Sequence, residues 1–181
     1  MATNRRILLS EIPTGKLTEE HFTQDEVELT SPGDGEVLVR TLILSQDAAN
    51  RAWMQGATYR SALSSGQVMS SGGIAEVVES NVDRFKVGQI VSGDLGWQEY
   101  AVIPGHQLTP VKDQDGPLSH SLSLLGVAGL TAYHGLINVP GIHAGEVLLV
   151  SAAGGSVGSI VGQIGRIKGA KVIGIAGGTE K

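Results

Sequence analysis

The pattern of apolar and polar positions changes once along the chain. Up to about residue 111, short runs rich in β-branched residues alternate with turn residues, and the clearest runs are 37–44, 72–79, 87–94 and 98–103. Several short strands at this spacing predict a partly open β-barrel. From residue 145 onward, longer apolar runs alternate with a helical pattern, which is typical of an α/β arrangement.

The α/β part begins with a buried strand at 147–150 that runs into a glycine-rich turn. A helix is predicted to follow and to close at Gly169, before a second strand at 171–176. The apolar residues of this helix share one face, which we assign to core packing: Val157, Ile160, Val161, Ile164 and Ile167. Strand, turn, helix and strand in this order predict the first βαβ unit of a dinucleotide-binding domain.

A polar linker at 113–117 separates the two patterns, and residues 119–138 after it are predicted to be helical in two pieces interrupted near 126–129. We place the boundary between Lys112 and Gly126, which gives one domain at 1–120 and a second at 121–181. Residues 47–61 are predicted to form a loop or a short helix. Large side chains there make this segment a candidate substrate wall, with Trp53 and Tyr59 as its candidates.

Composition excludes several kinds of site. The chain has 181 residues and no cysteine, which removes every zinc site built with thiolates, and its five histidines lack metal-ligand spacing, so no metal is expected. The net charge of −5 without a basic stripe argues against nucleic-acid binding. No apolar run approaches the roughly 20 residues of a membrane span, and a cytoplasmic protein is expected.

The turn itself matches a G-x-G-x-x-G pattern with alanine in the first place. It consists of Ala153, Gly154, Gly155, Ser156, Val157 and Gly158. Ala153 permits the tight turn, Gly155 lets the backbone approach a pyrophosphate, and Gly158 lets the helix pack closely. The alternative is an ordinary strand-to-helix turn, and the order of the surrounding elements favours a cofactor site.

The tip of the second predicted strand favours NADP(H) over NAD(H). NAD sites usually carry a carboxylate there, whereas Gly177 and Gly178 occupy this position and Glu180 follows a few residues later. The two glycines leave room for a phosphate, Thr179 can donate a hydrogen bond, and Lys181 adds positive charge. From chemistry alone, a solvated terminal Lys181 is nearly as good an interpretation.

The sequence resembles the zinc-independent, medium-chain NADP-dependent reductases, in the group of prostaglandin (leukotriene), alkenal double-bond and curcumin reductases. The segments that carry the resemblance are 4–7, 35–38, 44–47, 95–100, 129–135, 151–158 and 176–181.

This resemblance implies a GroES-like barrel followed by an incomplete Rossmann domain, with the active site between them. It implies hydride transfer from NADPH to the β-carbon of an α,β-unsaturated ketone or aldehyde, and protonation of the α-carbon. Residues 152–158 would hold the pyrophosphate and Lys181 the 2′-phosphate. Thr131 and Tyr133 match a segment near the cofactor, although core packing fits Tyr133 equally well.

Two departures from the family pattern matter. Ala49 stands where relatives carry a tyrosine near the substrate, so Trp53 or Tyr59 is left to form the wall. No catalytic residue is assigned, because the tyrosine implied to assist catalysis lies beyond Lys181, and little catalysis is expected from this chain alone. The alternatives are a quinone reductase of the same superfamily, or a non-enzymatic GroES-like module whose truncated tail pairs with another chain through open strand edges.

Overall fold

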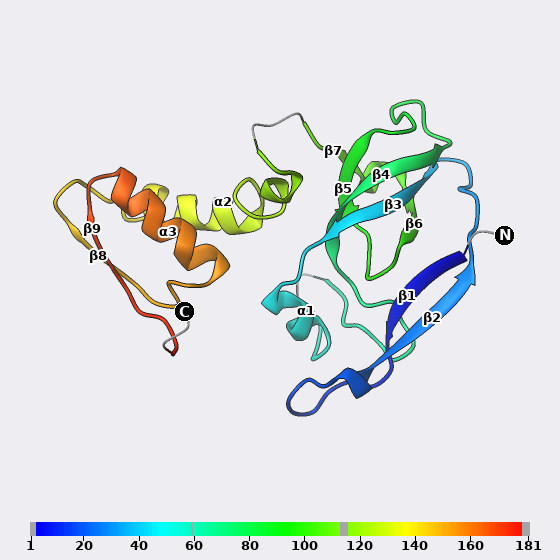
Figure 1. Ribbon diagram of the computed structural model, residues 1–181, viewed down its shortest axis with the longest axis horizontal. Helices are drawn as coiled ribbons and strands as arrows, with labels where there is room; N and C mark the ends of the chain where they lie inside the picture. Colours follow the sequence, from blue (N-terminus) through cyan, green and yellow to red (C-terminus); the bar gives the residue numbers. More distant parts are fainter. Residues whose placement is uncertain (1–2, 59, 113–115, 179–181) are drawn as a thin grey trace. The chain divides into compact units, whose positions relative to one another are not determined.

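The computed structural model describes residues 3–58, 60–112 and 116–178, and the chain divides into two compact units, 1–113 and 114–181. Each unit is described by itself below, with the element labels of Figure 1. None of the helices in the described ranges is both long enough and apolar enough to cross a membrane.

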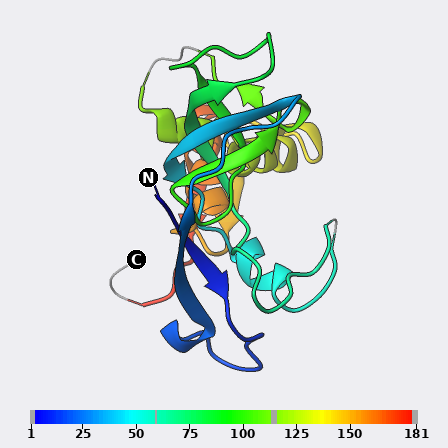
Figure 2. The ribbon, with the colours of Figure 1, turned by 90° about the vertical axis from the view of Figure 1, so that its right-hand side faces the viewer.

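The first unit starts with an antiparallel hairpin. Strand β1 (Thr3–Leu9) pairs along its whole length with β2 (Phe22–Glu28), and the short 3₁₀ helix η1 (Glu19–His21) precedes β2. Figure 2 shows the hairpin extending away from the larger sheet. Leu9 is fully buried at the end of β1, where it packs with Met54 and Met69.

The larger sheet has five antiparallel strands in the order β6-β3-β4-β5-β7. They are β3 (Glu36–Leu44), β4 (Gly72–Ser80), β5 (Ile90–Asp94), β6 (Tyr100–Pro104) and β7 (Thr109–Pro110), with the 3₁₀ helix η2 (Gly105–Gln107) after β6. Inward-facing β-branched side chains, among them Val37, Val39, Val77 and Val91, form its buried core. Residues two positions apart on a strand point to the same face of the sheet, which places Val37 and Val39 together in this core.

Backbone hydrogen bonds link β1 to the segments that precede β4 and β6 of the larger sheet. The Ile7 amide donates to Trp97 (2.8 Å), the Met69 amide donates to Ile7 (2.9 Å), and the Glu99 amide donates to Arg5 (3.0 Å). The predicted partly open barrel is therefore confirmed. A short helix, α1 (Ala48–Trp53), follows β3 and begins with an Asp47 cap, and the described residues after it form a loop, so the segment 47–61 contains both a short helix and a loop.

The second unit contains the predicted βαβ unit. Strands β8 (Val147–Val150) and β9 (Lys171–Gly174) pair in parallel, and α3 (Ser156–Ile167) connects them. Gly169 lies after α3 with a φ of 81°, as a glycine C-cap requires. Strand β9 ends two residues earlier than expected.

The segment before β8 is helical in pieces, as predicted. It forms η3 (Leu118–Ser121), α2 (Val127–Tyr133) and the π-helical turn η4 (His134–Asn138). The interruption lies at 122–126, slightly earlier than expected, because Gly129 is inside α2. There its missing side chain lets the backbone pass close to Leu124.

Candidate functional site

The glycine turn is built on a strained residue at the end of β8. Ala152 has a φ of 49°, which makes it the one non-glycine residue with positive φ in the described part of the chain. Its carbonyl oxygen accepts a hydrogen bond from the Gly155 amide at 2.9 Å. This closes a tight turn and lets α3 begin at Ser156, directly beyond the extended Gly155.

Two positions in the turn leave little or no room for a side chain. A Cβ added to Gly158 would meet the Ala152 carbonyl oxygen and would lie 3.0 Å from the Ala152 carbonyl carbon and the Ala153 Cα. At Gly155, an added Cβ would lie 3.2 Å from the Ala152 carbonyl oxygen. The glycines therefore let the first turn of α3 pass directly against the backbone that leaves β8.

Ala153 lies close to the end of the second strand. A Cβ on Gly174 would lie 2.8 Å from the Cβ of Ala153, and the Ala153 amide donates to Ile175 at 2.9 Å. The alanine in the first place of the motif thus joins the turn to the end of β9.

The turn borders a hollow of about 430 Å³. Its lining residues are Leu149, Val150, Ser151, Ala152, Gly155, Ser156, Val157, Gly158 and Val161. The N-cap of α3 is Gly155, which has no side chain, so among the described residues no capping side chain accepts from the first backbone N–H groups of the helix. Such amides, together with the positive end of the helix dipole, favour an anionic ligand.

The residues expected to select the cofactor are described only in part. Gly177 and Gly178 are exposed, a Cβ on either would meet nothing within 4 Å, and Gly178 has a φ of 77°. Thr179, Glu180 and Lys181 lie outside the described residues. The space that the two glycines leave open is compatible with a phosphate.

Thr131 and Tyr133 are both exposed on α2. The Tyr133 side chain is 49% exposed and contacts the His134 ring edge-to-face at 6.1 Å between centroids. Tyr133 therefore does not lie in the core of the second unit. The approach of Thr131 and Tyr133 to a cofactor stays a prediction.

Trp53, expected to form part of a substrate wall, is nearly buried rather than exposed. Trp53 is only 7% exposed, and the Arg60 guanidinium lies over its ring, 4.4 Å from the centroid. Tyr59 lies outside the described residues. Arg60, which covers the Trp53 ring, is a residue that sequence reasoning did not single out.

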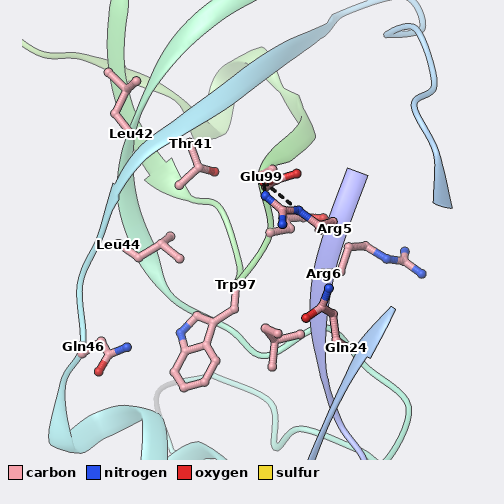
Figure 3. A pocket seen from close by; sticks show the side chains of 11 residues that line it. Arg5, Arg6, Gln24, Thr41, Leu42, Leu44, Gln46, Trp97 and Glu99 are labelled. Carbon is pink, nitrogen blue, oxygen red and sulfur yellow. Dashed lines mark hydrogen bonds and ion pairs between the residues drawn. The ribbon is translucent and has the colours of Figure 1, made fainter. Parts of the chain in front are cut away.

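A second hollow, of about 510 Å³, lies in the first unit between β1, β3 and the segment before β6 (Figure 3). Its apolar walls include Ile7, Leu42, Leu44 and Trp97, and an ion pair between Arg5 and Glu99 borders it. The hydrogen bond from Arg5 lowers the pKa of the Glu99 carboxyl and raises the pKa of Arg5. No local sequence pattern indicates this hollow, because its walls come from separate segments of the chain, at residues 5–7, 24, 41–46 and 97–99.

The described residues contain no group of three or more histidines, cysteines or carboxylates that could hold a metal ion. The two hollows also differ in chemistry. The one at the glycine turn has exposed backbone amides at a helix N-terminus, whereas the one in the barrel is lined mainly by side chains of β1 and β3.

Comparison with known proteins agrees with this architecture. Residues 5–111 match the family described as the N-terminal domain of oxidoreductase. The chain is 42% identical to the NADPH-dependent curcumin reductase of Escherichia coli over 98% of its own length and 52% of that protein. It is 42% identical to prostaglandin reductase 1 of the mouse over 91% of its own length and 49% of that protein.

A solved structure has the same fold. The crystal structure of CurA from Vibrio vulnificus in complex with NADPH superposes with a TM-score of 0.88 at 39% identity, covering 97% of this chain and 52% of that one. The chain thus spans about half the length of the relatives it matches. It belongs to the oxidoreductase family defined by this N-terminal domain, within the zinc-independent medium-chain reductase group that its sequence resembles.

Proposed function

We propose that this chain is part of an NADPH-dependent reductase that reduces the C=C bond of α,β-unsaturated ketones or aldehydes. The observation that carries the proposal is the turn at 152–158, whose backbone leaves no room for a side chain at Gly158. The names of the relatives support the same reaction class, since they are curcumin and prostaglandin reductases.

The described residues fit a dinucleotide phosphate. Gly155 and Gly158 let the start of α3 lie directly against the Ala152 backbone, and the uncapped amides of α3 are donors suited to a pyrophosphate. Ser156 lies at the first position of the helix, where its hydroxyl can donate another hydrogen bond. Gly177 and Gly178 would leave space for a 2′-phosphate, with Lys181 as its proposed cation.

NADPH, when bound, supplies the hydride for the C=C bond. The residues of this chain would hold its phosphates and so fix the position of the nicotinamide relative to the substrate. Thr131 and Tyr133, exposed on α2, are proposed to contact the cofactor. The proton for the α-carbon is assigned to no residue of this chain.

The experiment measures binding first, because binding depends on residues that this chain contains. NADPH and NADH are titrated against the wild-type chain and the Gly158→Ala variant, and NADPH oxidation is then followed with a simple enone, a 2-alkenal and a quinone. Preference for NADPH, loss of binding in the variant, and little oxidation by this chain alone are expected, and any oxidation that occurs should depend on the enone or alkenal. Oxidation driven by the quinone alone would instead support a quinone reductase.

A further inference from the structure

The hollow between β1, β3 and the segment before β6, called the hollow beside β1 from here on, is walled by backbone that is fixed on both sides. The Thr41 amide donates to the Glu99 carbonyl at 2.8 Å, and the Trp97 amide donates to the Met69 carbonyl at 2.7 Å. The Trp97 carbonyl in turn accepts from the Ile7 amide at 2.8 Å. The volume of about 510 Å³ lies within the range of small-molecule sites, roughly 300–1,000 Å³.

Three side chains of this wall carry a polar atom that has no hydrogen-bond partner among the described residues. These atoms are Thr41 Oγ1, Trp97 Nε1 and Arg6 Nε, and each is closed off from solvent. In Figure 3, Thr41 belongs to β3 on one side of the hollow, Arg6 belongs to β1 on the other, and Trp97 lies between them. Buried polar atoms are nearly always paired in native proteins, so three unpaired atoms around one hollow point to a ligand that pairs with them.

The chemistry of the three atoms defines the polar group of that ligand. The indole Nε1 of Trp97 and the guanidinium Nε of Arg6 can only donate a hydrogen bond, and the Thr41 hydroxyl can donate as well. A carbonyl oxygen therefore matches this wall, whereas a group that only donates, such as an ammonium, does not. Side chains commonly change rotamer on binding while the backbone stays in place, which would bring these donors to a ligand oxygen in the hollow.

The remainder of the wall favours an uncharged ligand with an apolar body. Apolar surface is supplied by Ile7, Leu42, Leu44 and the Trp97 ring. Both arginines of the wall already have a carboxylate partner, since Arg5 pairs with Glu99 and Arg6 pairs with Asp25. An anionic ligand would compete with these carboxylates, and a cationic ligand would find no unpaired carboxylate among the lining residues.

We propose that the hollow beside β1 binds a small, uncharged molecule that carries an apolar group and a carbonyl oxygen. Trp97 and Thr41 donate hydrogen bonds to the oxygen, and Ile7 and Leu44 contact the apolar group. The site lies wholly within the first unit. It is independent of the proposed cofactor site at the glycine turn and of the proposed reductase activity.

An NMR titration of the isotopically labelled chain with three compounds of one phenylbutyl skeleton tests the ligand class. 4-Phenylbutan-2-one carries a carbonyl oxygen, 4-phenylbutyrate carries a negative charge, and 4-phenylbutylammonium carries only donors. The chain has two tryptophans, so Trp97→Phe assigns the indole N–H signal of Trp97. The ketone should bind in roughly the millimolar range, as expected for a ligand of about eleven heavy atoms, and should move this signal downfield. The other two compounds should bind more weakly.

Thr41→Val separates ligand binding from folding. The variant loses the hydroxyl but keeps the shape of the side chain, so its affinity for the ketone should fall roughly threefold to tenfold. Its melting temperature should stay the same or rise, because a buried hydroxyl without a partner is removed. Trp97→Phe keeps an aromatic ring near Phe22 but loses the N–H group, and its affinity should fall by a similar factor.

Thr109→Val is the matched control, because Thr109 lies on β7 and does not line the hollow. Its affinity for the ketone should equal that of the wild-type chain. Absence of ketone binding well above the expected Kd would overturn the proposal. Equal binding of the ammonium compound or tighter binding of the carboxylate would overturn the assigned ligand class. Unchanged affinity in both Thr41→Val and Trp97→Phe would also overturn the proposal, because the ketone would then bind elsewhere.

Discussion

The carbonyl oxygen of Ala152 occupies the space that a side chain on Gly158 would need. Ala152 turns the chain out of β8 with a φ of 49°, and its carbonyl also accepts the Gly155 amide at 2.9 Å. One strained residue therefore sets both the closeness of α3 to the turn and the direction of the first helical amides. The proposed cofactor site depends on this relationship.

Gly158→Ala should destabilise the second unit. The new methyl group would meet the Ala152 carbonyl, which cannot move without opening the turn, so we expect a loss of about 1–3 kcal/mol in the free energy of unfolding. Urea unfolding followed by circular dichroism measures this change. Gly135→Ala is the matched helical control, since a Cβ there meets nothing within 4 Å, and equal destabilisation by both variants would contradict the account.

Two glycines of α3 should respond in opposite directions to the same substitution. A Cβ on Gly165 would meet Leu148 Cδ2 and would lie 3.2 Å from Val172 Cγ2, so Gly165→Ala should destabilise through overpacking. At Gly162 the same atom would lie an ordinary 3.7 Å from Val172 Cγ1. Gly162→Ala should therefore stabilise by about 0.5–1 kcal/mol through helix propensity.

Thermal unfolding of the two variants beside the wild-type chain measures the difference. A lower melting temperature for Gly165→Ala and a higher one for Gly162→Ala are expected. A gain in both variants would mean that α3 packs less closely on β8 and β9 than described.

These glycines also show how far the sequence determines the fold. The order of strand, turn, helix and strand follows from local patterns, so β8, α3 and β9 could be predicted within a few residues. That Gly165, rather than Gly158, packs against the strand side chains could not be predicted, because it depends on where Leu148 and Val172 meet the helix. Helix periodicity predicts which face of α3 packs against the strands, but not which residue on that face lies closest to them.

The first unit also contains features that the sequence pattern does not predict. Short alternating runs predicted strands, yet β2 (Phe22–Glu28) is a strongly polar sequence that becomes a strand through pairing with β1. The ion pair of Arg60 with Asp94 joins residues 34 positions apart, and no local pattern indicates it. Contacts of this kind depend on the tertiary arrangement, so neither this ion pair nor the hollow beside β1 could be predicted from the sequence.

The hairpin should lose stability in acid through Asp25. The hydrogen bond from Arg6 lowers the pKa of the Asp25 carboxyl, so its stabilising effect is present above the ordinary aspartate pKa of about 4 and is lost as the pH falls through the lowered value. Asp25→Asn removes the effect at every pH. The difference in urea midpoint between wild type and variant should therefore be largest near pH 6 and shrink below about pH 4.

Glu28→Gln provides the control for this comparison, because Glu28 is an exposed carboxylate at the end of the same hairpin and takes part in no ion pair among the described residues. Its substitution should give no such pH-dependent difference. A difference for Asp25→Asn that stays constant with pH would show that the carboxylate charge is not the cause.

Self-association should involve the face of the β8–β9 sheet that α3 does not cover. Val147 and Leu149 are 62% and 61% exposed on this face, and Ile173 is 44% exposed beside them. Adjoining exposed apolar side chains of this size favour association. The double variant Leu149→Thr, Ile173→Thr should lower the mass measured by light scattering at high concentration, and an unchanged mass would place the association elsewhere.

The most direct test of the central claim is an NMR titration of the isotopically labelled chain with NADPH, because amide shifts report even weak binding residue by residue. The account predicts the largest shifts at the amides of Gly154 to Gly158, additional shifts at Gly177 and Gly178 with NADPH that are smaller with NADH, and loss of these shifts in Gly158→Ala. Shifts absent from residues 152–158, or equal in the wild-type chain and Gly158→Ala, would contradict the assignment of the glycine turn as the cofactor site.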